Sequence, residues 1–81
     1  MSNEGAYLVW FKVVLQKEPV KQYKAARALV NLNSAKKRVY ETDSSAYIEC
    51  GVPDGFAKRL VDGLLKLGIH ADVIKEGDAI V

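Results

Sequence analysis

The chain has 81 residues, a formal net charge of +2 and a hydrophobic fraction of 49%, which describe one small globular domain rather than a disordered chain. No apolar run approaches the roughly 20 residues needed to cross a bilayer, and the first residues lack the pattern of a secretory signal. A single cysteine, Cys50, excludes an internal disulfide. We therefore expect a cytoplasmic protein that does not enter a membrane.

The first element expected along the chain is a strand over residues 7–16, because this segment is rich in aromatic and β-branched residues. Side chains of a strand alternate between its two faces. The more apolar set is expected to face helices, and the other set to face solvent or a partner. That second set consists of Leu8, Trp10, Lys12, Val14 and Gln16.

Two helices are expected next, over residues 18–30 and 32–41. Pro19 suits the first turn of the first helix, and the second helix would turn Leu32, Ala35 and Val39 inward. The region from Lys17 to Arg38 contains seven bases and one acid, a net charge of +6, so both helices would present cations on their outer sides. A patch of one sign steers oppositely charged partners, which points to binding rather than to catalysis.

Residues 42–45 are expected to form a loop and residues 46–50 a second strand. After a turn at residues 51–54, the apolar positions of the next segment recur with the i, i+3, i+4 spacing of a helix. Gly68 would end that helix in a left-handed conformation. A third strand over residues 69–75 and a turn at residues 76–78 complete the pattern.

The expected order is therefore β-α-α-β-α-β. It predicts an α/β (α+β) two-layer sandwich, in which a three-stranded antiparallel sheet carries its helices on one face. The domain would span residues 7–75. Residues 1–6 would be a flexible N-terminus, and residues 76–81 a C-terminal tail.

This order, together with the stretch from Leu32 to Val39 and the turn Cys50-Gly51-Val52, resembles the C-terminal domain of the bacterial ribosomal stalk protein. In that family, the first helix and the start of the second contact translational GTPases. The resemblance implies a protein-binding module. The cations that flank Val20 and Tyr23 favour an acidic protein as its partner, and catalytic activity is not expected. The surface would consist of Val20, Lys21, Tyr23, Lys24, Arg27, Lys36 and Lys37.

Several alternatives stay open. The family's N-terminal dimerisation region is not evident, so the module is also expected to serve as an adaptor or as an inhibitor of host machinery encoded by a phage or mobile element. The same basic patch could bind nucleic acid. The sheet face with Leu8, Trp10, Val14 and Tyr47 could form a second interface, including a homodimer, or be covered by the chain termini.

The residue types that carry chemistry are few. Cys50 is expected to be a small buried hydrophobe, and His70, the single histidine, to lie on a strand surface. One histidine and one cysteine do not make a zinc site without carboxylates. No catalytic residue, metal site or cofactor is therefore predicted.

Overall fold

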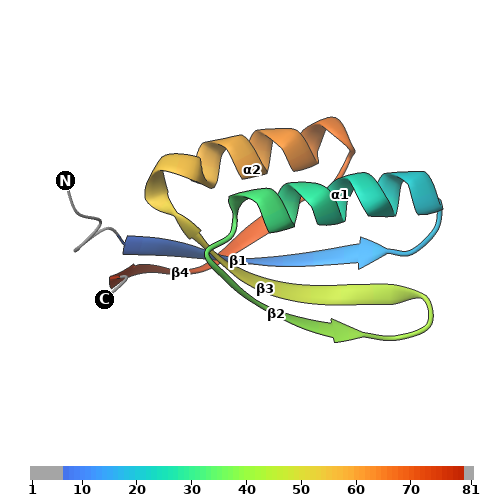
Figure 1. The fold of residues 1–81 in the computed structure, drawn as a ribbon, viewed down its shortest axis with the longest axis horizontal. Coiled ribbons are helices and arrows are strands. Elements are labelled where there is room, and N and C mark those ends of the chain that lie inside the picture. The colour runs from blue at the N-terminus through green and yellow to red at the C-terminus, as the bar shows by residue number, and fades with distance from the viewer. Residues whose placement is uncertain (1–6, 80–81) are drawn as a thin grey trace.

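The computed structural model describes residues 7–79, in which two helices pack on one face of a four-stranded antiparallel sheet (Figure 1). The elements in chain order are β1 (Tyr7–Gln16), α1 (Val20–Asn33), β2 (Lys36–Glu41), β3 (Ser45–Pro53), α2 (Asp54–Lys66) and β4 (Ala71–Ala79). The strand order is β2-β3-β1-β4, so each β-α-β unit has a strand of the other unit between its own two strands. This is the split β-α-β, or ferredoxin-like, arrangement.

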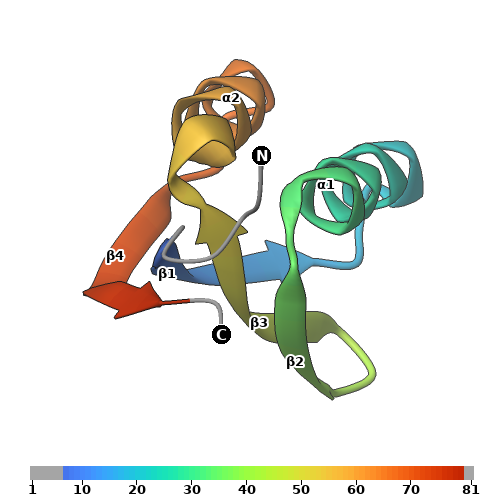
Figure 2. The same cartoon turned by 60° about the vertical axis from the view of Figure 1, so that its left-hand side comes forward.

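The core lies between the two central strands and the helices. Figure 2 shows α1 and α2 side by side over the same face of the sheet, with β2 and β4 on opposite sides. Alternate residues of β1 and β3 pair across the ladder and point into this layer, as Val13 and Ile48 do. The largest fully buried side chains of this layer come from β1, β3 and both helices: Leu15, Ile48, Leu60, Leu64, Val13, Val30 and Val52.

Backbone hydrogen bonds close the end of α2. The N–H of Gly68 donates to the carbonyl of Leu65, and the N–H of Ile69 donates to the carbonyl of Leu64, both at 2.9 Å. Gly68 has φ of 77°, the left-handed conformation that this motif requires. The prediction that Gly68 ends the helix in this conformation is confirmed.

The prediction of a second helix over residues 32–41 is wrong. α1 continues to Asn33, Leu32 is 78% exposed, and residues 36–41 form β2, which pairs antiparallel with β3. A tight connection makes this hairpin possible, because Thr42 and Ser45 bond each other through backbone and side-chain atoms. Once the hairpin forms, the Tyr40 ring packs beside the Tyr47 ring, which a helix would not allow.

The sheet therefore has four strands, and the predicted three-stranded β-α-α-β-α-β order is corrected to β-α-β-β-α-β. The broader prediction of an antiparallel sheet with its helices on one face is confirmed. The strand predicted over residues 7–16 is confirmed at both ends. β3 is longer than expected because residues 51–53 continue the ladder with β1.

The C-terminal boundary is also corrected. Residues 76–78 form no turn, because β4 runs to Ala79 with Tyr7 as its last partner on β1. The proposed flexible N-terminus at residues 1–6, and residues 80 and 81 of the proposed tail, lie outside the described residues. Over the part of the chain described, neither helix combines the length and apolar character needed to cross a bilayer.

Candidate binding surfaces

One face of the sheet carries no helix among residues 7–79, because α1 and α2 both lie on the other side (Figure 1). Residues that pair directly across an antiparallel ladder point to the same side. The register therefore identifies the side chains of this face, which we call the open face. From the Trp10 position to the Gln16 position its members are Trp10, Lys12, Val14, Gln16, Lys36, Arg38, Tyr40, Ser45, Tyr47, Glu49, Gly51, Asp72 and Lys75.

The register arranges most of these residues in three rows that cross the strands. The first row is Lys36, Gly51, Trp10 and Lys75. The second row is Arg38, Glu49, Lys12 and Asp72. The third row is Tyr40, Tyr47 and Val14. A row of four charged residues thus separates two rows that contain aromatic rings.

The third row is exposed. Tyr40, Tyr47 and Val14 retain 54%, 36% and 46% of their accessible surface. The rings of Tyr40 and Tyr47 lie 5.9 Å apart between centroids and are tilted by 58° to each other. A pair of this kind presents a ring surface together with hydroxyl groups to any molecule that covers it.

The first row contains a shallow hollow. Trp10 is partly buried, and its indole lies against Gly51 of the neighbouring strand. A register shift in β4 between the partners of Trp10 and Phe11 allows Ile74, which is 49% exposed, to line the same hollow. The hollow has a volume of about 180 Å³ and is lined by Trp10, Arg38, Glu49, Ile74 and Lys75.

Positive charge exceeds negative charge on the open face. Within the three rows, lysine or arginine stands at four positions and a carboxylate at two, which are Glu49 and Asp72. Arg38 approaches Glu49 at 4.0 Å, yet its side chain is 71% exposed, so this contact is weak and leaves the guanidinium accessible. The open face therefore combines aromatic rings with a net positive charge.

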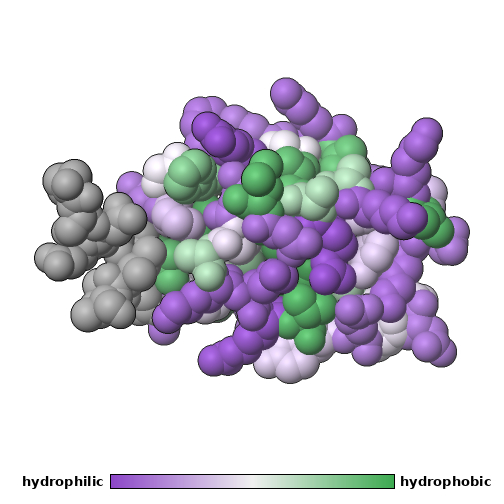
Figure 3. Space-filling view, viewed as in Figure 1, coloured by the Kyte–Doolittle hydropathy of each residue, from purple (hydrophilic) through white to green (hydrophobic). Residues whose placement is uncertain are grey.

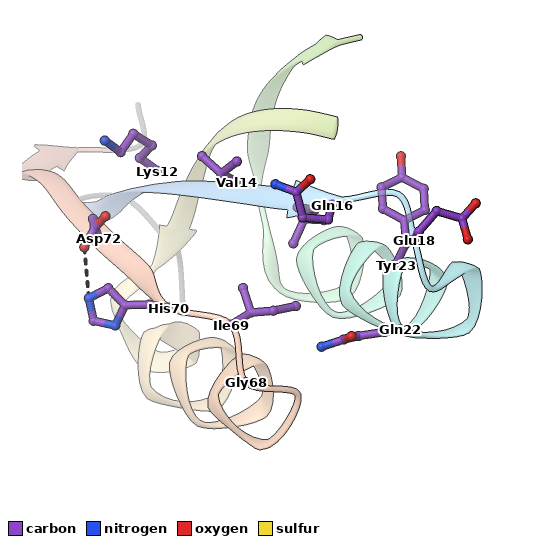
Figure 4. A pocket seen from close by; sticks show the side chains of 11 residues that line it. Lys12, Val14, Gln16, Glu18, Gln22, Tyr23, Gly68, Ile69, His70 and Asp72 are labelled. Atoms are coloured by element: carbon purple, nitrogen blue, oxygen red, sulfur yellow. Dashed lines mark ion pairs between the residues drawn. The ribbon is translucent and has the colours of Figure 1, made fainter. Parts of the chain in front are cut away.

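A larger cavity, which we call the notch, opens at the end of β1 (Figure 4). β4 begins at Ala71 opposite Val13, so among the described residues no β4 partner lies beside residues 14–16. The notch occupies this place and has a volume of about 380 Å³. Its lining comes from β1, from the start of α1 and from the segment that leads into β4: Lys12, Val14, Leu15, Gln16, Glu18, Gln22, Tyr23, Gly68, Ile69, His70 and Asp72.

Polar groups surround the notch. Gln22 and Ile69 point toward each other across it (Figure 4). The Gln22 amide donates to the Leu67 carbonyl. Nε2 of His70 lies 2.9 Å from Oδ1 of Asp72 at the other end. The side chains of His70 and Asp72 are exposed and keep 76% and 54% of their accessible surface. The notch is therefore open to solvent and offers hydrogen-bonding groups from three elements.

The basic surface predicted on two helices is divided in the structure. Val20, Lys21 and Lys24 are exposed on α1. Lys36 and Lys37 lie instead on β2, where adjacent residues of a strand point to opposite faces. Lys36 thus belongs to the open face, and the predicted surface is not continuous.

Tyr23 and Arg27 are partly buried rather than free on the helix. Nη1 of Arg27 donates to the Tyr23 hydroxyl at 2.7 Å and lies 3.6 Å from Oε2 of Glu41. Nζ of Lys17 lies 2.8 Å from Oε1 of the same carboxylate. The Lys17 ammonium lowers the pKa of Glu41, and the carboxylate raises the pKa of Lys17. This group joins α1 to the end of β2, so it contributes to the fold.

A further hollow lies between the helices, with a volume of about 570 Å³. Its lining is Pro19, Lys21, Gln22, Ala25, Lys66 and Leu67. Figure 3 shows apolar side chains that reach the surface in the helix layer and are surrounded by polar ones. Val20, at the start of α1, is 46% exposed but is not part of this lining. The remaining part of the predicted helix surface is therefore apolar with lysines at its border.

The second interface predicted from the sequence lies partly on the open face. Trp10, Val14 and Tyr47 belong to it. Leu8 is on the same side by register but is only 2% exposed, so it offers no surface to a partner. Sequence reasoning missed the contributions of Arg38 and Tyr40, because both were assigned to a helix. The alternation of residues 36, 38 and 40 with the more apolar Val39 was the signal that could have placed them on a strand.

The remaining candidates for chemistry lie apart from one another. Cys50 is buried in the core, and burial raises the pKa of its thiol. Nε2 of His70 contacts Oδ1 of Asp72. Across residues 7–79, no group of three His, Cys, Asp or Glu side chains could hold a metal ion.

Comparison of the chain with protein families, with curated proteins and with solved structures found no match in any of the three. The resemblance to the ribosomal stalk domain therefore stays a prediction. The helix that it implied over residues 32–41 is a strand in this structure.

Proposed function

We propose that this protein binds single-stranded nucleic acid on the open face of its sheet. The observation that carries the proposal is the arrangement of two aromatic rows on either side of a charged row, on the face that no described helix covers. A four-stranded sheet that presents aromatic side chains is a known way of binding unpaired bases. The proposal rests on this site and not on any relative.

Base stacking is supported by the exposure of the rings. The exposed Tyr40 and Tyr47 are close enough to form one platform, and the partly buried Trp10 offers a second one at the position four residues from Val14 along β1. At about 3.3 Å per residue, the two platforms are separated by about 13 Å along the strand. Bases of one flexible strand can reach both platforms, whereas the bases of a duplex are stacked inside it.

Phosphate binding is supported by the cations between and beside the rings. Lys12 lies in the charged row, and Lys36 stands in the same row as Trp10. Arg38 keeps an exposed guanidinium, which can pair with a phosphate or stack on a base. Positive groups that alternate with rings are the usual composition of a surface that follows a single strand.

The test is fluorescence anisotropy with labelled single-stranded RNA and DNA of mixed sequence at about 50 mM salt. Wild type is compared with a Tyr40→Ala/Tyr47→Ala double variant. Each base that loses its stacking partner is expected to cost about 1–3 kcal/mol of binding free energy. Both rings are partly exposed, so the double variant is expected to stay folded, which circular dichroism checks.

Phe56→Ala is the matched control, since Phe56 is a 42% exposed ring on α2, in the other layer. It is expected to bind as wild type does. Absence of binding by wild type at low salt would contradict the proposal. So would a stable dimer in light scattering whose formation Tyr40→Ala/Tyr47→Ala abolishes, because the open face would then be occupied by a second copy.

A second function is favoured by a separate observation, the apolar hollow between α1 and α2, on the helix layer where Val20 is also exposed. Lys21 and Lys66 line this hollow, and Lys24 is exposed on the same helix. We propose as the second candidate that an acidic, partly apolar protein binds there. The resemblance to the stalk domain would make a translational GTPase one such partner.

This second candidate is tested by capture from a bacterial lysate with wild type and with Lys21→Glu/Lys24→Glu. Arg27 is left unchanged because it bonds Tyr23 and approaches Glu41. An acidic protein retained by wild type and lost with the variant is the expected result. Recovery of the same proteins by both would contradict it. Neither result affects the open face, which lies in the other layer.

A further inference from the structure

We infer that the notch at the end of β1 selects one nucleobase of the single-stranded nucleic acid that crosses the open face. This inference rests on the proposed function, since it assigns a role to a cavity at the border of the same surface. Lys12, Val14 and Gln16 belong to both the open face and the notch.

The register leads from the tyrosine pair to the notch. The third row runs from Tyr40 to Tyr47 to Val14, and the next position across the sheet would belong to β4. β4 begins only at Ala71 opposite Val13, so the notch takes that position. Neighbouring strands are about 4.8 Å apart, so Tyr47 and the notch are separated by about 10 Å. A single-stranded nucleic acid whose bases stack on Tyr40 and Tyr47 can therefore place a neighbouring base in the notch.

The volume and lining of the notch suit a planar polar ring. About 380 Å³ is within the range of small-molecule sites, which combine apolar walls with a few convergent polar groups. Val14 and Ile69 supply apolar surface, and the buried Leu15 lies behind them. Gln16 and Gln22 supply amides that can both donate and accept hydrogen bonds, as reading the edge of a base requires.

Other polar side chains of the notch would fix the orientation of a bound base. His70 and Asp72, joined at 2.9 Å, form the end of the notch nearest β4 and provide a further donor and acceptor. Lys12 stands at the mouth on the open face, where it can contact the phosphate that follows the selected base. A cavity with these groups holds some bases better than others. The rings of the open face discriminate little, because every base has a face that stacks.

The experiment compares binding of wild type to four single-stranded homopolymers by anisotropy. The notch is altered by Gln16→Ala/His70→Ala, which leaves the Gln22 amide bonded to Leu67 and the core untouched. Wild type is expected to prefer one homopolymer over the least favoured by at least about five-fold. The double variant is expected to lose that preference and to keep the affinity for the least favoured one.

Asn31→Ala serves as the control, since it removes an exposed amide from α1, away from the notch, and should keep the preference. Equal binding of all four homopolymers by wild type would overturn the inference and leave the proposed function standing. If Gln16→Ala/His70→Ala kept the wild-type preference for one homopolymer, this inference would also be overturned and the proposed function would stand. Absence of binding to any homopolymer would overturn both the proposed function and this inference.

Discussion

Trp10 and Gly51 stand directly opposite each other on β1 and β3, and the indole of Trp10 occupies the space that a side chain at position 51 would take. A Cβ atom on Gly51 would lie 2.9 Å from Cε2 and Cζ2 of the indole and 3.0 Å from Cδ1 of Leu8. The glycine therefore allows the ring to lie across the neighbouring strand. That position makes the indole a wall of the hollow in the first row.

Replacement of Gly51 by alanine should displace the indole. We expect Gly51→Ala to lower the free energy of unfolding by about 1–3 kcal/mol, the usual cost of inserting a methyl group into a packed site. Urea unfolding measures this change. The emission of Trp10, the single tryptophan, should shift in the folded variant because its surroundings change.

Gly55→Ala is the control for this prediction. A Cβ at Gly55 meets nothing within 4 Å, and the residue lies in α2. Alanine is favoured over glycine in helices, so this variant should be as stable as wild type or up to about 1 kcal/mol more stable. Equal unfolding curves for Gly51→Ala and Gly55→Ala would show that the indole does not depend on position 51.

A second glycine is required by backbone conformation rather than by space. Gly68 has φ of 77° at the end of α2, and a Cβ there would meet no atom within 4 Å. Gly68→Ala is therefore expected to lower the free energy of unfolding by about 1–2 kcal/mol through left-handed strain alone. Gly68→Asn should lose less, because asparagine tolerates this conformation better. Thermal or urea unfolding that ranks alanine at or above asparagine would contradict this account.

Elements with a strong internal pattern could be predicted from the sequence. β1 alternates apolar residues with period two, and its buried set faces the helices as expected. In α2, the helical spacing predicts that Leu60, Leu64 and Leu65 are buried; Leu60 and Leu64 lie in the core, whereas Leu65 is 55% exposed. Gly68 ends the helix for a reason that is local to its own backbone. Each of these features depends on residues that are close in the sequence.

β2 could not be predicted in this way because its stability comes from its partner strand. Lys36, Lys37 and Arg38 are exposed in the structure, and exposed charged residues fit a helix as well as a strand. Residues 36–41 form a strand because they pair with β3, and the contact between Tyr40 and Tyr47 adds to this pairing. The same error kept Arg38 and Tyr40 out of the predicted site. A helix would direct residues 36, 38 and 40 around its axis, whereas a strand directs them to one face.

The carboxylate of Glu41 joins two elements and should make stability depend on pH. Its pKa is lowered by Lys17, so its stabilising effect is present above the ordinary pKa of a glutamate and is lost as the pH falls through its lowered value. The pKa of Lys17 is raised, so the effect also fades as the pH rises through that raised value. Glu41→Gln is expected to be less stable than wild type at neutral pH and to approach it in acid.

A double-mutant cycle of Lys17→Met and Glu41→Gln isolates the contact from other effects of each change. Both side chains are partly exposed, so the coupling should be small and should weaken in high salt. The measurement is the urea midpoint at neutral and at acidic pH. A coupling that is the same at both pH values would contradict the assignment to this ion pair.

Cys50 should resist modification while the protein is folded. Its side chain is fully buried between β1, β3 and the helices, and burial raises the pKa of the thiol, so little thiolate is present and a reagent cannot reach it. Reaction with an aromatic disulfide at neutral pH is expected to be slow and to accelerate with urea along the unfolding curve. Equal rates in native and unfolded protein would show that the thiol is accessible.

The salt dependence of nucleic-acid binding distinguishes the two faces of the molecule. Each phosphate contact on a single strand contributes about 0.7 to the slope of the logarithm of affinity against the logarithm of salt concentration. Lys12 and Lys36 belong to the open face, whereas Lys21 and Lys24 are exposed on α1. Lys12→Ala/Lys36→Ala is therefore expected to reduce the slope by about 1.4.

Lys21→Ala/Lys24→Ala changes the net charge by the same amount and serves as the control. Its effect on the slope should be small, because general attraction over a distance is screened beyond about 10 Å at 0.1 M salt and only direct phosphate contacts remain. If this pair reduces the slope as much as Lys12→Ala/Lys36→Ala does, the strand follows the helix layer instead of the sheet. In that case, the rings of Tyr40 and Tyr47 would lie on the wrong side of the molecule to stack on its bases, and truncating them would leave the affinity unchanged.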